Sequence, residues 1–184
     1  MVARSRMGGP WSRAKRVAHA FRDGGHEVTL VWGDDGNCSD PGGPTLEIPV
    51  SSPLGLPDAI ARHTFPLASR LGLTGRKPVH SFEEVLWLTG ALDERYTRAA
   101  VEVLRAHIRA ARPDVVYSEF NLAAVIAARA EGIPCVGSGS QPTTAPYASN
   151  PRQTAGLRRL LREMGMPAPA PSLSLFEGMA RRVI

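Results

Sequence analysis

The segment SRAKRVAHAFRDGGHEVTLVW, residues 12–32, decides the fold, because it predicts a helix, a glycine turn and a strand in direct succession. Ser12 can cap a helix whose apolar residues follow the i, i+3, i+4, i+7 spacing: Ala14, Val17, Ala18 and Phe21. Gly24 and Gly25 end this helix, and the apolar, β-branched run 27–32 predicts a buried strand. A helix followed at once by a buried strand is typical of a βαβ unit.

The same alternation continues along the chain. In order, we expect a strand over 45–50, two helices over 82–111 broken near Gly90, a strand over 114–118, an alanine-rich helix over 122–130, a strand over 135–138 and a helix over 152–164. Short apolar strands alternating with helices predict an α/β fold with a doubly wound parallel sheet. The central strand before the first helix can come only from residues 1–3, so we expect it to be largely missing and the fold to be marginally stable.

Length and composition favour one domain of ordinary size. The chain has 184 residues, of which 43% are hydrophobic, enough for one packed core. No apolar run reaches the roughly 18 residues that span a membrane, and the first residues lack the apolar core of a signal peptide. We therefore expect a cytoplasmic protein without a transmembrane segment.

Cysteine, histidine and charge exclude several classes of site. The two cysteines, Cys38 and Cys135, cannot build a disulfide framework or a zinc cluster, and Cys135 lies in an apolar run that predicts a core position. The five histidines lack ligand spacing, so we expect no metal site. The net charge is +5, but 20 of the 22 basic residues are arginines scattered along the chain, so no nucleic-acid partner is expected.

Ligands of doubly wound sheets bind outside the carboxyl ends of the strands, which directs attention to the loops there. Gly8 and Gly9 precede a helix and could bind an anion, or could simply form a tight turn. Glu119 follows the 114–118 strand and could move a proton, or could be a solvated or helix-capping acid. The loop 138–144 is rich in small polar side chains that could bind a ligand, or could be an ordinary crossover. Trp87, with Phe82 and Leu86, could line an acceptor pocket, or could belong to the core.

Three motifs, in order and at suitable spacing, carry a family resemblance: DGGHEVTL at 23–30, RPDVVYSEF at 112–120 and GIPCV at 132–136. Together they resemble the N-terminal domain of GT-B glycosyltransferases, of the family 1, macrolide and UDP-glucuronosyl type. The resemblance implies two Rossmann-like domains, the first binding the acceptor and the second a nucleotide sugar. Residues 1–166 would form the acceptor-binding domain, and the proline-rich residues 167–184 a linker or tail towards an absent donor-binding domain.

The resemblance also implies roles for single residues. Many members use a histidine after the first strand as the base, but its position falls near Pro10, which cannot accept a proton. Glu119 falls at the position of the acid that assists this histidine, and is our candidate catalytic residue. Candidate acceptor-binding residues, from these loops and from the residues above, are Gly8, Gly9, Trp87, Asn121, Ser138, Ser140 and Gln141.

The expected function is the acceptor-binding half of a hexosyltransferase, inactive alone and without a tightly bound cofactor. A UDP- or dTDP-sugar would be the donor of the complete enzyme, and the partners would be a small-molecule acceptor and a donor-binding domain or subunit. One alternative is a non-catalytic subunit that pairs with a separate donor-binding chain. Another is a nicotinamide dinucleotide-binding oxidoreductase domain, whose acid Asp34 or Asp35 could supply, although Gly8 and Gly9 do not complete a G-x-G-x-x-G turn.

Overall fold

A computed structural model describes residues 2–4, 8–33, 41–53, 56–57, 60, 63, 82–138, 152–167 and 182–183. The chain divides into two compact units, each made of separate segments. Unit 1 comprises residues 1–50, 98–139 and 179–184, and unit 2 comprises residues 51–97 and 140–178.

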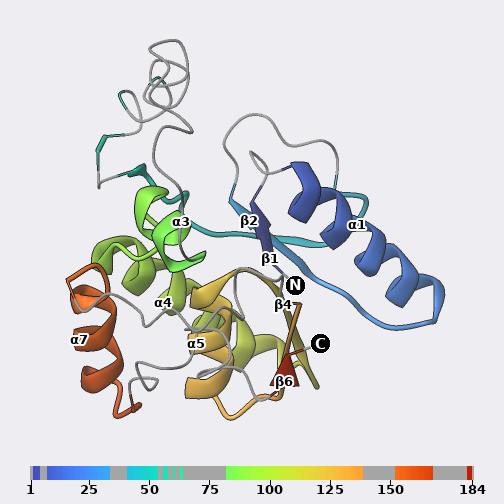
Figure 1. Cartoon of the computed structure of the whole chain (residues 1–184). Helices are drawn as coiled ribbons and strands as arrows, with labels where there is room; N and C mark the ends of the chain where they lie inside the picture. Colours follow the sequence, from blue (N-terminus) through green and yellow to red (C-terminus); the bar gives the residue numbers. More distant parts are fainter. Residues whose placement is uncertain are drawn as a thin grey trace. The chain divides into compact units, whose positions relative to one another are not determined.

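Unit 1 is built on a parallel sheet in the order β3-β2-β1-β4-β5-β6 (Figure 1). Every strand pair is parallel, and the strands are β1 (Val2–Arg4), β2 (Leu30–Gly33), β3 (Thr45–Glu47), β4 (Val116–Glu119), β5 (Cys135–Ser138) and β6 (Arg182–Val183). The α/β class and the parallel sheet are thus confirmed. β6 comes from the segment expected to be a linker or tail, and it lies beside β5.

The predicted shortness of the first strand is visible in its pairing. β1 has three residues and lies between β2 and β4. All three residues pair with β2, but only Val2 pairs with β4, opposite Ser118. Just before β4, Val115 is 49% exposed, although apolar residues next to a central strand are normally covered. The described pairing of β1 with β4 is therefore limited to one residue, beside a half-exposed Val115.

An apolar, β-branched extension of four residues fused upstream of Met1 is expected to raise the melting temperature. Each newly buried apolar side chain contributes about 1.5–3 kcal/mol, and about 1 kcal/mol shifts the midpoint of a chain of this size by roughly 2–4 °C. Circular dichroism during heating measures the shift, with a Gly/Ser extension of equal length as the control. Equal melting temperatures for the two extensions would show that β1 needs no further residues.

α1 (Gly8–Asp23) begins four residues before the expected cap at Ser12. Gly8, Gly9 and Pro10 form its first turn, where proline is tolerated because the first amides of a helix have no internal partner. The helix packs against β1 and β2 (Figure 1). Trp11 is buried there and stacks on Trp32 of β2, with 5.7 Å between the ring centroids.

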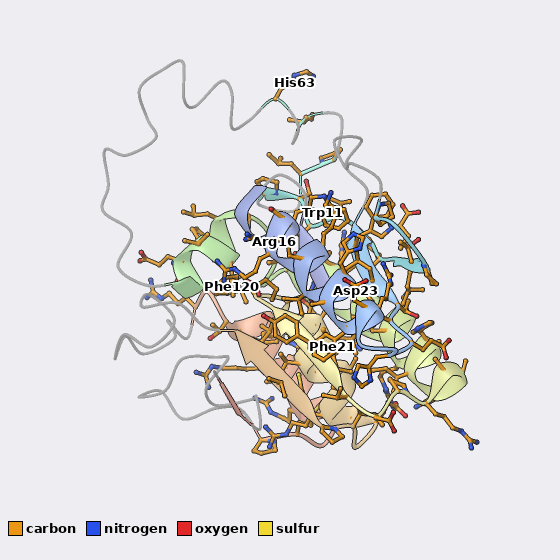
Figure 2. The ribbon with its side chains drawn as sticks, turned by 90° about the vertical axis from the view of Figure 1, so that its right-hand side faces the viewer. Trp11, Arg16, Phe21, Asp23, His63 and Phe120 are labelled. Carbon is orange, nitrogen blue, oxygen red and sulfur yellow. The ribbon has the colours of Figure 1, made fainter. Side chains whose placement is uncertain are left out.

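The far end of α1 differs from the expected apolar face. Phe21, labelled in Figure 2, is 46% exposed and meets the ring of His26 edge-on instead of entering the core. The side chain of Arg22 donates hydrogen bonds to the carbonyls of Gly42 and Val28, at 2.9 and 3.0 Å. These bonds tie the end of α1 to the segments before β2 and β3.

α4 (Glu94–Ala111) and α5 (Leu122–Ala130) follow the predicted helices closely. α5 packs against β4 and β5, and its residues 122–128 are all buried, as the small alanine side chains permit. On α4 the buried apolar residues are Ala100, Val101, Leu104 and Ile108. The expected inner residues Val103 and His107 are only half-buried, and Ala111 is exposed, because the helix is rotated slightly from the assumed face. Glu131, after α5, pairs with Arg105 and Arg109 of α4 at 2.5 and 2.9 Å.

Cys135, at the start of β5, is buried as predicted. Burial raises the pKa of its thiol to about 11, because a thiolate is poorly solvated there. At neutral pH the thiol is therefore protonated and behaves as a small apolar core residue.

Unit 2 contains α3 (Phe82–Leu88), the first turn of α4 and α7 (Ala155–Glu163). Its buried apolar side chains are Leu86, Leu92, Leu157, Leu160 and Leu161. The expected break between two helices near Gly90 is confirmed, with Gly90 at φ +74°. Across the described parts of both units, no helix is long and apolar enough to cross a membrane.

Candidate functional site

The carboxyl ends of β4 and β5 bring two of the candidate residues together in unit 1. Glu119 is the last residue of β4 and Ser138 the last of β5, and the two are register partners. On the other side of the sheet centre, Arg4 at the end of β1 pairs with Gly33 at the end of β2. Because all the strands are parallel, these residues lie along one edge, where ligands of such sheets bind.

Glu119 is enclosed in the protein. Its side chain has no exposed area, and its carboxylate meets one group on β4 and one on α1. The hydroxyl of Tyr117 donates a hydrogen bond to Oε2 at 2.8 Å. Oε1 lies 2.7 Å from Nη1 of Arg13, in an ion pair whose N–H is not aligned for a hydrogen bond. A buried carboxylate needs such a positive partner, because an unpaired charge in the interior is costly.

The structure contradicts two of the alternatives considered for Glu119, a solvated acid and a helix-capping acid. It is not a solvated acid, because it is buried, and it does not cap α5, because Asn121 does. Sequence reasoning missed Arg13, although Arg13 lies three residues, nearly one helical turn, after Pro10, where the family histidine was expected. An arginine keeps its proton at any physiological pH, so Arg13 can hold or orient a carboxylate or an anion but cannot serve as a base.

The turn from β4 to α5 is sharply defined. Phe120, labelled in Figure 2, has φ +54°, a left-handed conformation that is uncommon for a residue with a side chain. Asn121 follows and accepts a hydrogen bond from the amide of Ala124 through its side-chain oxygen, at 3.0 Å. The hydroxyl of Ser118 donates to the Asn121 carbonyl at 2.9 Å and accepts from the Asn121 amide at 3.2 Å. These hydrogen bonds give Asn121 a structural role. Its contact with an acceptor remains a prediction.

The remaining candidates of unit 1 occupy different positions. Gly8 and Gly9 lie in the first turn of α1 and not in a loop before it, so their amides belong to the helix N-terminus. The backbone of Ser138 ends β5, next to Glu119. Ser140 and Gln141 lie outside the described residues, so their role in acceptor binding stays a prediction. Asp34 and Asp35, the acids of the oxidoreductase alternative, also lie outside them.

Trp87 belongs to unit 2 and lines a cavity of about 330 Å³ there. The side chain of Trp87 is 38% exposed, whereas Leu86, expected to line the same pocket, is buried in the core. The side chain of Phe82, the third residue of this prediction, is not among those described. The other lining residues are Gly90, Leu92, Asp93, Glu94, Gln153 and Gly156. The acidic and amide side chains of this cavity were not singled out from the sequence, because Gln153 lies more than 50 residues after Asp93 and Glu94 along the chain.

Within the described segments, no group of three or more His, Cys, Asp or Glu side chains is arranged to hold a metal ion. Among the described side chains at this edge, the buried acid Glu119 is paired with the cation Arg13. This arrangement holds the carboxylate of Glu119 in place. It also presents the half-exposed guanidinium of Arg13 beside the first turn of α1, where it can bind an anion.

Comparison with known proteins gives a distant structural likeness. No family model matches the sequence, and no curated protein matches it. Among solved structures, the glycosyltransferase SnogD from Streptomyces nogalater has a TM-score of 0.47 and 20% identity over 93% of this chain and 40% of its own. The glycosyltransferase SsfS6 from Streptomyces sp. SF2575, complexed with thymidine diphosphate, has a TM-score of 0.47 and 19% identity over 83% of this chain and 41% of its own. The chain thus spans about two fifths of the length of these transferases.

Proposed function

We propose that this chain is the acceptor-binding half of a glycosyltransferase, which transfers sugar only together with a domain that binds the nucleotide sugar. The observation that carries the proposal is Glu119, buried at the carboxyl end of β4 and held by Arg13 of α1. This is the strand end at which the resembled family has its acid. The order β3-β2-β1-β4-β5-β6, the order of dinucleotide-binding sheets, supports the same assignment of the fold.

Arg13 changes the chemistry expected of this site. In the resembled family a histidine partner of the acid removes the acceptor proton. Here the partner of Glu119 is a guanidinium, which cannot accept a proton. Glu119 therefore acts as a positioning acid for α1. The acceptor proton is taken by another protein group, or is lost to water where the acceptor hydroxyl is itself acidic.

The test uses the purified chain with UDP-glucose and dTDP-glucose as donors and 4-methylumbelliferone, a phenol, as the acceptor. Isothermal titration should give no heat with either donor when the chain is alone. Adding a separately produced GT-B donor-binding domain should give glucose transfer, measured by mass spectrometry of the glucoside. Glu119→Gln should reduce this transfer at least tenfold, whereas Glu102→Gln, an equal charge change at an exposed position of α4, should leave it unchanged.

Three outcomes contradict the proposal. Tight binding of a nucleotide sugar by the chain alone would mean that it contains the donor site. Heat on titration with NAD⁺ would favour the oxidoreductase alternative. Isolation of the chain from its native source in a complex that transfers no sugar would favour a non-catalytic subunit.

A further inference from the structure

The cavity of unit 2 combines an aromatic ring, a carboxylate and an amide side chain, each with a polar atom that has no hydrogen-bond partner within the described residues. Trp87 is exposed on its wall, and no described group bonds its indole N–H. Asp93 uses only Oδ1, which accepts hydrogen bonds from the amides of Arg95 and Tyr96 at 3.0 and 3.1 Å. Its Oδ2 and the amide of Gln153 have no described partner, so both remain available to a ligand.

The charges of the cavity decide which ligand fits. Glu94 is paired with Arg159 of α7 at 3.1 Å, so this acid is neutralised. No described cation pairs with the carboxylate of Asp93. It lies at the N-terminus of α4, where the helix dipole contributes about +0.5 charge, which offsets only half of a unit negative charge. Among the described lining residues, Asp93 is thus the acid without a paired cation.

We propose that this cavity binds the ammonium group of a small organic molecule. The ring of Trp87 attracts a cation over its face, tryptophan being the best of the aromatic side chains for this. Oδ2 of Asp93 accepts a charge-assisted hydrogen bond from the ammonium, and Gln153 accepts a second one. A volume of about 330 Å³ suits a molecule with one ring and a short substituent.

Close helix packing keeps the cavity in shape. A Cβ atom on Gly156 of α7 would lie 3.0 Å from the Cβ of Glu94, so α7 approaches the first turn of α4 through this glycine. The approach brings Gln153 and Arg159 to Asp93, which precedes α4, and to Glu94, its first residue. That the ammonium compound is the sugar acceptor rests on the proposed function, whereas its binding does not.

The test is titration of the full chain with cyclohexylammonium chloride, with cyclohexanol as its neutral counterpart of similar size. Trp87 is the single tryptophan of unit 2, since Trp11 and Trp32 belong to unit 1, so its indole N–H signal in a proton–nitrogen spectrum reports the cavity. We expect that signal to shift on saturable binding of the ammonium compound, at millimolar concentration, and not with cyclohexanol or with equal sodium chloride.

Two variants and a control complete the test. Asp93→Asn keeps the helix cap, because asparagine caps as well as aspartate, and should weaken binding about tenfold or more. Trp87→Leu should weaken it about fivefold by calorimetry. Glu102→Gln, with the same charge change in unit 1, should bind normally. Equal binding of the alcohol, no binding of either compound, or normal binding by both cavity variants would overturn the proposal. Ammonium binding without sugar transfer in the two-part assay would contradict the proposed function alone.

Discussion

Gly90→Ala is expected to lower the free energy of unfolding of the chain by about 3 kcal/mol or more. Gly90 has φ +74°, which costs an alanine about 1 kcal/mol, and a Cβ atom there would lie 2.5 Å from the carbonyl carbon of Ser52, with the Ser52 oxygen closer still. Both contacts are to backbone, which cannot rotate away as a side chain can. Ser51 donates a hydrogen bond from its hydroxyl to the carbonyl of Thr89 at 3.0 Å, so the two segments are also bonded together.

The matched control is Gly132→Ala. Gly132 has φ +71°, nearly the same conformation, but no atom lies within 4 Å of the Cβ that would be added. It should therefore lose only the conformational part, about 1 kcal/mol. Urea denaturation followed by circular dichroism measures both variants. Equal losses for the two would show that the segment at Ser52 moves aside, and that contact with Gly90 does not hold this part of unit 2.

Glu119→Ala is expected to destabilise the chain by about 2–3 kcal/mol. The change removes a fully buried side chain, leaves a cavity and takes the acceptor from the Tyr117 hydroxyl. Breaking a fully buried ion pair costs about 3–5 kcal/mol, but the Arg13 side chain is 46% exposed and can regain water, so the loss should lie below that range.

A double-mutant cycle separates the ion pair from the packing. Glu119→Gln keeps the volume and an acceptor for Tyr117, so it should cost about 1 kcal/mol less than Glu119→Ala. The double variant Glu119→Gln/Arg13→Met should lower the free energy of unfolding by less than the sum of the two single changes, because each single change already breaks the same ion pair. Urea midpoints of the four proteins give the coupling energy. Strict additivity would mean that the 2.7 Å approach of Arg13 contributes no stability.

Hydrophobic spacing predicted the elements well wherever helix and strand signals were local. The helix over 122–130 and the strand over 135–138 have the expected bounds, and two helices do break at Gly90. The predicted start of a helix was wrong where one residue type is common both at the cap and inside the first turn. Ser12 can cap a helix, but it can also lie inside the first turn, and packing of Trp11 on Trp32 favours the earlier start of α1.

The candidate site was predictable only in part. The sequence placed Glu119 after a strand, because strand ends leave local signals, and left Trp87 open between a pocket wall and the core. It could not indicate Arg13 as the partner of Glu119, since more than 100 residues separate them and their distance depends on how α1 packs on the sheet. The same holds for Gln153 and Asp93, which the packing of α7 on α4 brings to one cavity.

By itself the sequence determined the α/β class and the order of the described helices and strands from α1 to α7, because each depends on local spacing and on turn residues. It did not indicate β6, whose pairing with β5 is a contact between distant segments. Only the tertiary structure decided that Glu119 is buried and ion-paired, that Asn121 and not Glu119 caps α5, and that Asp93 and Glu94 share a cavity with Gly156 of α7. Burial and charge pairing arise from contacts between segments distant in sequence, and no local pattern encodes those distances.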